Sequence, residues 1–336
     1  MFKQYKTHAF RAFAAPSLAA LCLATVPAAA QAQAPGQAFP AKPVKLVVGF
    51  AAGGPTDVVA RAFADHASRA LGQPFLVENR PGANTILAAQ AVATAPADGH
   101  TLLFAATNHS MIPALYSSQV KFDAQHSFRP ICTLATSPTV LVVGKSLPIR
   151  TLAQYMDKAK KEPGRITAGT AGTGSSGHFA TEMFARAQGL SLNHVPYKGA
   201  APVITDLMGG QIDSSFATLG SVLPQIRSDK LSALAVASPQ RSALLPDVPT
   251  FAEAGGGNYS ADAWYGVLAP AGIPAPVAQA LERVATEFAQ SEAATQKLRK
   301  LGLDAASTCG TAFAAQVERE VTTYTQIAKD LNLQTN

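Results

Sequence analysis

The sequence predicts an α/β protein made of two lobes. Short apolar segments typical of strands alternate along the chain with segments whose apolar residues recur at helical spacing. This alternation is typical of sheets that are covered by helices. Roughly 300 residues would remain after removal of an N-terminal export signal, and that length exceeds one comfortable hydrophobic core. We therefore expect two α/β lobes rather than one.

The first half of the chain gives the clearest signals. A strand is expected over 44–50, and a helix should begin near Pro55, because proline suits the first helical position. Thr151 should cap a later helix, which Pro163-Gly164 would end. The remaining strands expected here are apolar and bounded by turn residues: 75–79, 101–107 and a longer strand region that ends at 140–144.

The second half continues the same alternation until a long loop interrupts it. Residues 239–262 are rich in proline, glycine and alanine, so we expect no helix or strand there. The chain should close on a helix with Val277 and Phe288 on one face and a longer helix carrying Phe313. The strands expected in this half are 165–171, 192–197, 213–217, 231–237 and 264–270.

The N-terminus has the order of a secretory signal peptide. Basic residues precede an apolar run of 14 residues over 17–30, and Ala30-Gln31-Ala32 supplies the small residues of a cleavage site. A membrane anchor is the alternative, but the run is shorter than the roughly 20 residues that span a bilayer. We expect a signal peptide over 1–32, a mature chain that begins near Gln33, and a periplasmic protein.

Charge and cysteine content narrow the possible partners. Removing 1–32 takes away Lys3, Lys6 and Arg11 and no acid, so the net charge falls from +6 to +3. We expect no nucleic-acid partner, since the longest basic cluster is 158–161. Two cysteines remain, and an oxidising compartment permits one disulfide between them. These cysteines are Cys132 and Cys309. The sequence leaves it equally open that they are two separate buried thiols. Neither the number nor the spacing of the cysteines indicates a metal site.

One glycine motif resembles a dinucleotide fingerprint. Gly172-x-Gly174-x-x-Gly177 follows an expected strand and precedes an expected helix. The acidic residue that should hold the ribose about 20 positions later is missing, because 189–199 contains no Asp or Glu. We expect no cofactor. The glycines instead indicate that backbone amides approach a ligand closely at a helix N-terminus.

Catalytic motifs are missing as well. Neither Ser175 nor Ser176 lies in a Gly-x-Ser-x-Gly elbow, and no His-Glu-x-x-His spacing occurs. His109 and His178 could face a cleft, although packed turn residues are the more common case. We expect no catalytic residue and no enzyme activity; a secreted α/β enzyme is the alternative from another class.

The turns after the strands are the best candidates for a binding site, because open α/β sheets bind ligands there. In the first such turn, Gly53 and Gly54 can expose their amides. Asp57 falls in the first turn of the following helix, where it could complement the helix dipole. It could equally accept a hydrogen bond from a ligand ammonium group or a water, and the sequence leaves both roles open.

Five segments, in order along the chain, carry a family resemblance: FAAGGPTDVVAR (50–61), VENRPGAN (77–84), ADGHTLLFA (97–105), VPYKGAAPVITDLMGGQID (195–213) and LPDVPTFAEAG (245–255). They resemble the tripartite tricarboxylate transporter receptors, the Bug/TctC family. The resemblance implies a two-lobed type II periplasmic binding protein fold that closes on a carboxylate. We expect lobe I over 41–140 plus 264–336 and lobe II over 141–263.

The resemblance also implies a set of ligand-binding residues: Gly53, Gly54, Pro55, Thr56, Asp57, Asn84, Thr107, Asn108, Thr136, Thr170, Thr173, Gly174, Ser175, Ser176, Tyr197, Lys198, Gly199, Ala217 and Thr218. Asn84 departs from the family, which more often has glycine there, and it could add a polar contact or cap a helix. Only Asp57 and Lys198 of the set are charged. A carboxylate would therefore be held mainly by amides and hydroxyls at helix N-termini. The Ser and Thr residues could also simply cap their helices.

The expected function follows from this resemblance. The protein would capture a small carboxylate outside the cytoplasm, as a monomer, and deliver it to the large and small membrane subunits of a tripartite transporter. A co-receptor that presents the same ligand to a sensory membrane protein is the main alternative.

Overall fold

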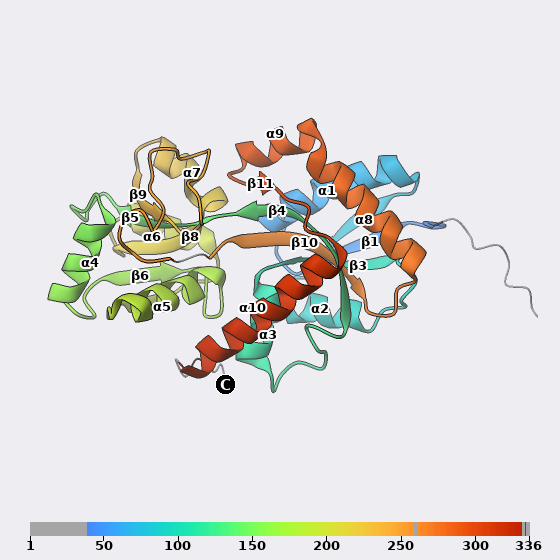
Figure 1. Ribbon diagram of the computed structural model, residues 1–336, viewed down its shortest axis with the longest axis horizontal. Helices are drawn as coiled ribbons and strands as arrows, with labels where there is room; N and C mark the ends of the chain where they lie inside the picture. Colours follow the sequence, from blue (N-terminus) through green and yellow to red (C-terminus); the bar gives the residue numbers. More distant parts are fainter. Residues whose placement is uncertain (1–38, 259–260, 331–332, 334–336) are drawn as a thin grey trace, which may run out of the picture. The chain divides into compact units, whose positions relative to one another are not determined.

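The computed structural model describes residues 39–258, 261–330 and 333, and their strands form two mixed sheets (Figure 1). The signal peptide expected over 1–32, with cleavage near Gln33, lies outside the described residues. The first sheet has the order β11 (Asp304–Ala305), β4 (Phe128–Ser137), β10 (Ala263–Pro270), β3 (Thr101–Ala106), β1 (Val44–Val48), β2 (Phe75–Asn79). The second has the order β7 (Asn193–Pro196), β6 (Thr167–Thr170), β8 (Ser214–Thr218), β5 (Thr139–Gly144), β9 (Leu231–Val236). The predicted α/β class is confirmed.

Helices cover both faces of the first sheet. Strand β1 pairs in parallel with β2 and β3, and such strands need apolar residues on both faces because helices bury both. Phe63 and Phe288 pack on one face of the sheet, whereas Phe313 packs against Trp264 on the other. The helices on the first face are α1 (Pro55–Leu71), α8 (Ala275–Gln290) and α9 (Glu292–Lys300); those on the second are α2 (Ile86–Ala93) and α10 (Gly310–Asp330).

The second sheet is built in the same way. Every residue of β5 is buried, which agrees with its continuous apolar sequence. Tyr155 and Phe184 pack on one face, and Val203 and Val222 on the other. The helices are α4 (Leu152–Lys161) and α5 (Ser176–Gln188) on the first of these faces, and α6 (Ala200–Met208) and α7 (Leu219–Arg227) on the second. Thr151 caps α4 as predicted, in a reciprocal pair with Gln154.

The long strand region expected to end at 140–144 is two strands that belong to different sheets. Strand β4 ends at Ser137 in the first sheet and β5 begins at Thr139 in the second, with Pro138 between them. Proline has no N–H to donate to a strand partner, so the ladder breaks there. The chain returns from the second sheet to the first through 261–263. There the Ala261 N–H donates to the Ala237 carbonyl before β10 begins. The lobe boundaries of 41–140 plus 264–336 and 141–263 stay a prediction.

A disulfide joins two distant parts of the chain beside the first sheet. Cys132 on β4 is bonded to Cys309, which directly precedes α10, and 177 positions separate them. Their Cα atoms are 4.0 Å apart, because the two backbones also form a bridge there. Thr133 donates to the Thr308 carbonyl at 2.9 Å, which extends this pairing. Of the two states that the sequence left open, the structure has the bonded one.

Candidate functional site

A cavity of about 640 Å³ lies at the carboxyl ends of strands from both sheets. We call the lining residues contributed by the first sheet and its turns the first wall: Phe50, Ala51, Ala52, Gly54, Pro55, Thr56, Asn84, Ala106, Thr107, Asn108, Ala263 and Tyr265. Those contributed by the turns of the second sheet form the second wall: Ala171, Ser175, Ser176, Lys198, Gly199, Ala200, Ala201, Pro202, Ile204, Thr218 and Ser221.

Helix N-termini from both sheets converge on this cavity. The N-cap residues of α1, α3 (Asn108–Tyr116), α5, α6 and α7 all line it: Gly54, Thr107, Ser175, Gly199 and Thr218. The N–H groups of a first helical turn have no partner within the helix and carry a partial positive charge. The arrangement therefore presents the cavity with converging donors that favour an anion.

The helices differ in whether their first-turn N–H groups already have a partner in the protein. Helices α1 and α6 begin after Gly54 and Gly199, which have no side chain to cap the first turn. Their first-turn N–H groups are therefore left for a ligand or water. In α7, by contrast, Leu219 donates to the Pro138 carbonyl at 2.8 Å and Gly220 to the Ser137 hydroxyl at 3.3 Å. Two first-turn N–H groups of α7 are thus already satisfied by the protein itself.

Lys198 is the one formally charged residue among those that line the cavity in the described chain. It lies in the turn before α6 and is exposed. No acidic side chain of the described residues lies within ion-pair distance of it, whereas several other basic side chains of the fold, Arg61 among them, are paired with an acid. Its ammonium group can move toward an anion in the cavity without breaking an internal bond.

Asp57 is a structural residue of the first turn. Its carboxylate is 3% exposed and accepts from the Gly53 N–H at 2.9 Å, the Asn79 amide at 2.8 Å and the Arg61 guanidinium at 3.0 Å. Burial alone would raise the pKa of Asp57, but these hydrogen bonds outweigh burial and lower the pKa below its usual value. Both carboxylate oxygens are occupied by protein donors, which leaves no acceptor for a ligand ammonium group.

The glycines of the fingerprint-like motif have backbone and packing roles. Gly172 and Gly174 have φ of 132° and 79°, where a side chain would be strained. A Cβ at Gly174 would overlap the Leu115 side chain, and one at Gly177 would overlap the Phe216 carbonyl on β8. The motif lets the α5 turn approach its neighbours closely, and this accounts for its glycines without a dinucleotide.

His178 holds this turn from inside α5. The Gly174 N–H donates to Nδ1 of His178 at 3.1 Å. Burial, with a smaller effect from His194, lowers the pKa of His178 to about 4, so the ring is neutral near pH 7. The ring of His194 stacks on it at 4.0 Å and shares a hydrogen bond of 2.7 Å with the Thr170 hydroxyl.

The turn before α2 is strained. Ala83, Asn84 and Thr85 all have positive φ, of 45°, 47° and 72°, which costs about 1–2 kcal/mol for each residue with a side chain. Asn108 donates its amide hydrogens to the Asn84 carbonyl and the Thr85 hydroxyl, and these bonds hold the turn in place. Thr85 also packs tightly against Gly49, where no side chain would fit. Such local strain is common at binding sites.

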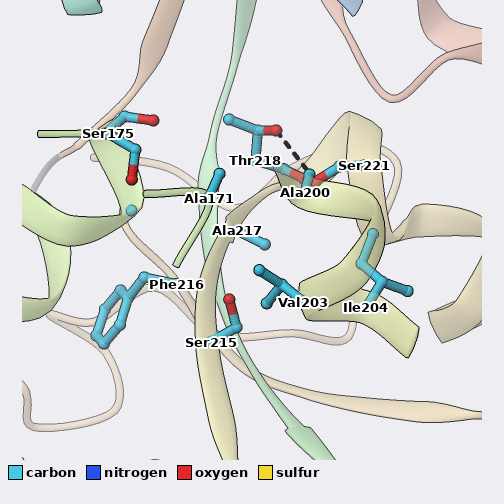
Figure 2. Close-up of a pocket in the computed structure, with 12 residues that line it drawn as sticks. Ala171, Ser175, Ala200, Val203, Ile204, Ser215, Phe216, Ala217, Thr218 and Ser221 are labelled. Atoms are coloured by element: carbon cyan, nitrogen blue, oxygen red, sulfur yellow. Dashed lines mark hydrogen bonds between the residues drawn. The ribbon is translucent and has the colours of Figure 1, made fainter. Parts of the chain in front are cut away.

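A smaller pocket of about 80 Å³ adjoins the cavity at the second wall (Figure 2). We call it the side pocket; it shares several lining residues with the cavity, including Ala171, Ser176 and Ile204. Residues that line it without lining the cavity are Gly177, Val203, Ser215, Phe216 and Ala217. It therefore extends the cavity toward the space between α6 and β8.

Two features of other protein classes are missing from the part of the chain that the structure describes. No group of three or more His, Cys, Asp or Glu side chains there could hold a metal ion. No helix of that part is long and apolar enough to cross a membrane.

The sequence matches a known receptor family. Residues 59–333 match the tripartite tricarboxylate transporter family receptor, TctC. The chain belongs to this family. It is 34% identical over 265 residues to the protein BugT of Bordetella pertussis, with 79% of this chain and 81% of the relative covered. A Cupriavidus necator protein named for the gbd 5′ region is 38% identical over 271 residues, with 81% and 80% covered.

Solved structures of several similar proteins have the same fold. A protein of R. palustris solved with adipate is 33% identical, with a TM-score of 0.79 and 87% of this chain and 97% of that chain covered. The periplasmic binding protein BugD is 31% identical, with a TM-score of 0.78 and 88% and 100% covered. MatC from Rhodopseudomonas palustris, solved with malate, is 30% identical, with a TM-score of 0.77 and 86% and 99% covered. The predictions of a periplasmic binding fold and of a solute-binding receptor rather than an enzyme are confirmed.

The structure of this TctC receptor brings together more than half of the predicted ligand residues. Those that line the cavity are Gly54, Pro55, Thr56, Asn84, Thr107, Asn108, Ser175, Ser176, Lys198, Gly199 and Thr218. Predicted residues that do not line it are Gly53, Asp57, Thr136, Thr170, Thr173, Gly174, Tyr197 and Ala217, of which Ala217 lines the side pocket.

Several of the residues outside the cavity have other partners. Thr136 pairs with Trp264 and Asp304 inside the first sheet. The Tyr197 hydroxyl donates to Asp206 at 2.7 Å, which turns its ring toward α6. These residues are adjacent to the ligand turns in sequence but do not line the cavity.

Sequence reasoning missed lining residues that are small and apolar, such as Ala51, Ala52 and Ala200. Alanine carries no chemical signal, but Ala52 and Ala200 each lie beside a glycine near a helix start, and that position could have indicated them. Tyr265 was also missed. It comes from β10 and lines the cavity, and burial raises the pKa of its hydroxyl to about 12, with a smaller opposing effect from Thr218. Only the strand pairing reveals that β10 passes the cavity.

Proposed function

We propose that this TctC receptor captures a small carboxylate in the cavity between its first and second walls. The observation that carries the proposal is the convergence of the α1, α3, α5 and α6 N-termini on one space that holds a single formal charge. A dianion or monoanion there would be met by many weak donors rather than by an arginine fork. Relatives solved with adipate and malate support the carboxylate class.

We further propose that the chain is exported and works in the periplasm. The basic and apolar segments of 1–32 and the Ala30-Gln31-Ala32 site support cleavage near Gln33. Delivery of the ligand to large and small membrane subunits follows the family name, tripartite tricarboxylate transporter receptor. The predicted lobes, 41–140 plus 264–336 and 141–263, would close on the ligand about the crossings at 137–139 and 261–263.

Ligand identification is the direct test. The protein is purified from the periplasm, denatured, and the released small molecules are analysed by mass spectrometry. We expect a small carboxylate at up to one molecule per chain, which calorimetry on ligand-free protein should then show to bind. A bound cation or neutral solute, with no binding of any carboxylate, would contradict the proposal.

A substitution at the α1 N-terminus tests where the anion lies. Gly54 has φ −78° and ψ 168°, and a Cβ there meets nothing closer than the Ala51 carbonyl at 3.9 Å. Gly54→Val should therefore fold but obstruct the approach of the ligand to the α1 N-terminus, weakening carboxylate binding at least a hundredfold, or about 2.7 kcal/mol. Gly272→Val, at an exposed turn outside the cavity, is the matched control and should bind as the wild type does. Equal affinities for both variants would place the ligand elsewhere.

A further inference from the structure

The side pocket differs in chemistry from the cavity that it adjoins. None of the residues that line it in the described chain is ionisable, and Figure 2 shows Val203 of α6 beside Ala217 of β8. Val203 is 3% exposed and Phe216 is 2% exposed. The inner part of the pocket is thus formed by apolar side chains that belong to the hydrophobic core of the second sheet.

Two of the hydroxyl groups that line the side pocket, those of Ser215 and Ser221, are already committed as donors. Ser215 donates to the Gly169 carbonyl at 2.7 Å, and Ser221 donates to the Thr218 carbonyl at 2.7 Å. These two hydroxyls can still accept a hydrogen bond through their lone pairs, but they have no proton left to donate to a ligand. An anion pushed into the inner part of the pocket would meet acceptors and hydrocarbon, and burying an unpaired charge is costly.

The donors that suit an anion lie at the mouth instead. Ser176 and Ala200 are the first residues of α5 and α6, and both line the cavity as well as the side pocket. A carboxylate held there would have its charge at the mouth. Any substituent on the neighbouring carbon could then enter the side pocket.

We propose that the side pocket receives an apolar branch of the bound carboxylate, two or three carbons long. This inference rests on the proposed function, since it needs a carboxylate in the cavity. The length follows from the volume of about 80 Å³, because one water-sized group occupies about 30 Å³. The receptor would thus prefer a branched carboxylate to the unbranched parent acid.

The test compares matched ligands by calorimetry. The probes are succinate, glutarate and adipate, each unbranched and with a methyl, ethyl, propyl or pentyl group on carbon 2. For at least one of the three parent acids, affinity should rise by about fourfold for each carbon added to the branch, up to the ethyl or propyl derivative. It should fall again for pentyl, which exceeds the volume of the pocket.

Two substitutions change the side pocket in opposite directions. Ala217→Leu fills it, so the ratio of branched to parent affinity should drop to one or below. Val203→Ala enlarges it, so the preferred branch should lengthen by one or two carbons. Val222→Ala is the matched control, because Val222 is buried in the same apolar cluster and lines neither space; it should keep the wild-type ratio.

The outcomes separate the two proposals. If parent acids bind and no branched acid binds more tightly, the side-pocket inference is wrong and the proposed function stands. If no acid of either kind binds, both are wrong. Should Ala217→Leu fail to fold in circular dichroism, the shift expected for Val203→Ala still decides the matter, and an unchanged preference in that variant overturns the inference.

Discussion

The turn before α1 and the turn before α5 use the same backbone device with different side chains. In each, a glycine of positive φ donates its N–H to a side chain four residues later, inside the first helical turn. Gly53, with φ 88°, donates to Asp57 at 2.9 Å, and Gly174, with φ 79°, donates to His178 at 3.1 Å. We call the pair Gly53–Asp57 the first brace and the pair Gly174–His178 the second brace.

The two braces differ in the charge of the acceptor. Asp57 is ionised and is also paired with Arg61 and Asn79, whereas His178 is neutral and stacks on another histidine. A turn of this kind therefore needs a buried acceptor and not a charge. It follows that an acid in such a turn is no evidence for a cationic ligand group.

The braces also decide which amides a ligand can use. The N–H groups of Gly53 and Gly174 are occupied by the braces, although the sequence suggested both glycines as ligand contacts. The N–H donors for the ligand must come from later positions in these turns, such as Thr56 and Ser176, which line the cavity. The glycines shape the turn, and the helix starts face the ligand.

The largest difference between the braces should appear when a methyl group is added to each glycine. Gly174→Ala combines left-handed strain with overlap against the buried Leu115 side chain, and should lower the free energy of unfolding by about 2–4 kcal/mol. Gly53→Ala has open space within 4 Å and should cost only the strain, about 1–2 kcal/mol. Urea unfolding monitored by circular dichroism measures both. Adding Leu115→Ala should recover part of the Gly174→Ala loss, and equal losses at the two glycines would refute the packing argument.

Removing the acid of the first brace should have the next largest effect. Asp57→Ala leaves the Gly53 N–H and the Asn79 amide without their acceptor and should lower the free energy of unfolding by about 1–3 kcal/mol. Arg61→Ala is the comparison, because Arg61 is 50% exposed and its loss should cost under about 1 kcal/mol. Chemical unfolding of the two variants gives the difference. A larger loss for Arg61→Ala would mean that the ion pair, not the brace, supports the turn.

Much of the fold could be predicted because its signals are local. The strand at 75–79 matches β2 in full, and the capping pair at Thr151 fixes the start of α4. The break at Pro138 was missed because both flanking segments are apolar and extended, and a sheet change leaves no local pattern beyond one proline. The short β11 was missed for a similar reason, since its two residues pair only through β4.

The site was harder to predict than the fold. A turn could be identified from its glycines, but the direction of each side chain in it could not. Asp57 points back to Gly53 and Tyr197 points to Asp206, and neither direction is encoded in spacing. Alanine lining residues and the passage of β10 depend on tertiary contacts, which no motif records.

Acid should weaken the second brace before the first. The unfolded chain binds a proton at His178 near pH 6.5, whereas burial lowers the pKa in the folded state to about 4. As the pH falls from 6.5 to 4 the unfolded state therefore takes up the proton first, and the contribution of His178 to the free energy of unfolding falls by about 1–2 kcal/mol at pH 5. The Asp57 contribution is lost only below about pH 4, because its pKa is lowered.

His178→Asn isolates this pH effect. The Asn side-chain oxygen can accept from the Gly174 N–H in place of Nδ1 but does not titrate. The facing groups, His194 stacked at 4.0 Å and Glu182 at 3.9 Å, are kept in the variant. Unfolding at pH 7 and pH 5 should show a smaller loss for His178→Asn than for the wild type. Identical losses would mean that other histidines carry the pH dependence.

The smallest effect expected is on binding, at the one charge of the cavity. Since Asp57 and His178 both accept hydrogen bonds inside the protein, attraction of the anion falls to the helix N-termini, with Lys198 as an accessory. Micromolar affinity corresponds to about 8 kcal/mol, which many amide and hydroxyl contacts can share.

Lys198→Met keeps most of the side-chain length and should weaken carboxylate binding by about tenfold, or about 1.4 kcal/mol, in calorimetry. Raising the salt concentration should shrink the gap between variant and wild type, because Lys198 is exposed and its attraction is screened. If Lys198→Met abolishes binding while Gly54→Val leaves it intact, the anion is held by a simple ion pair and the helix N-termini are not the anchor.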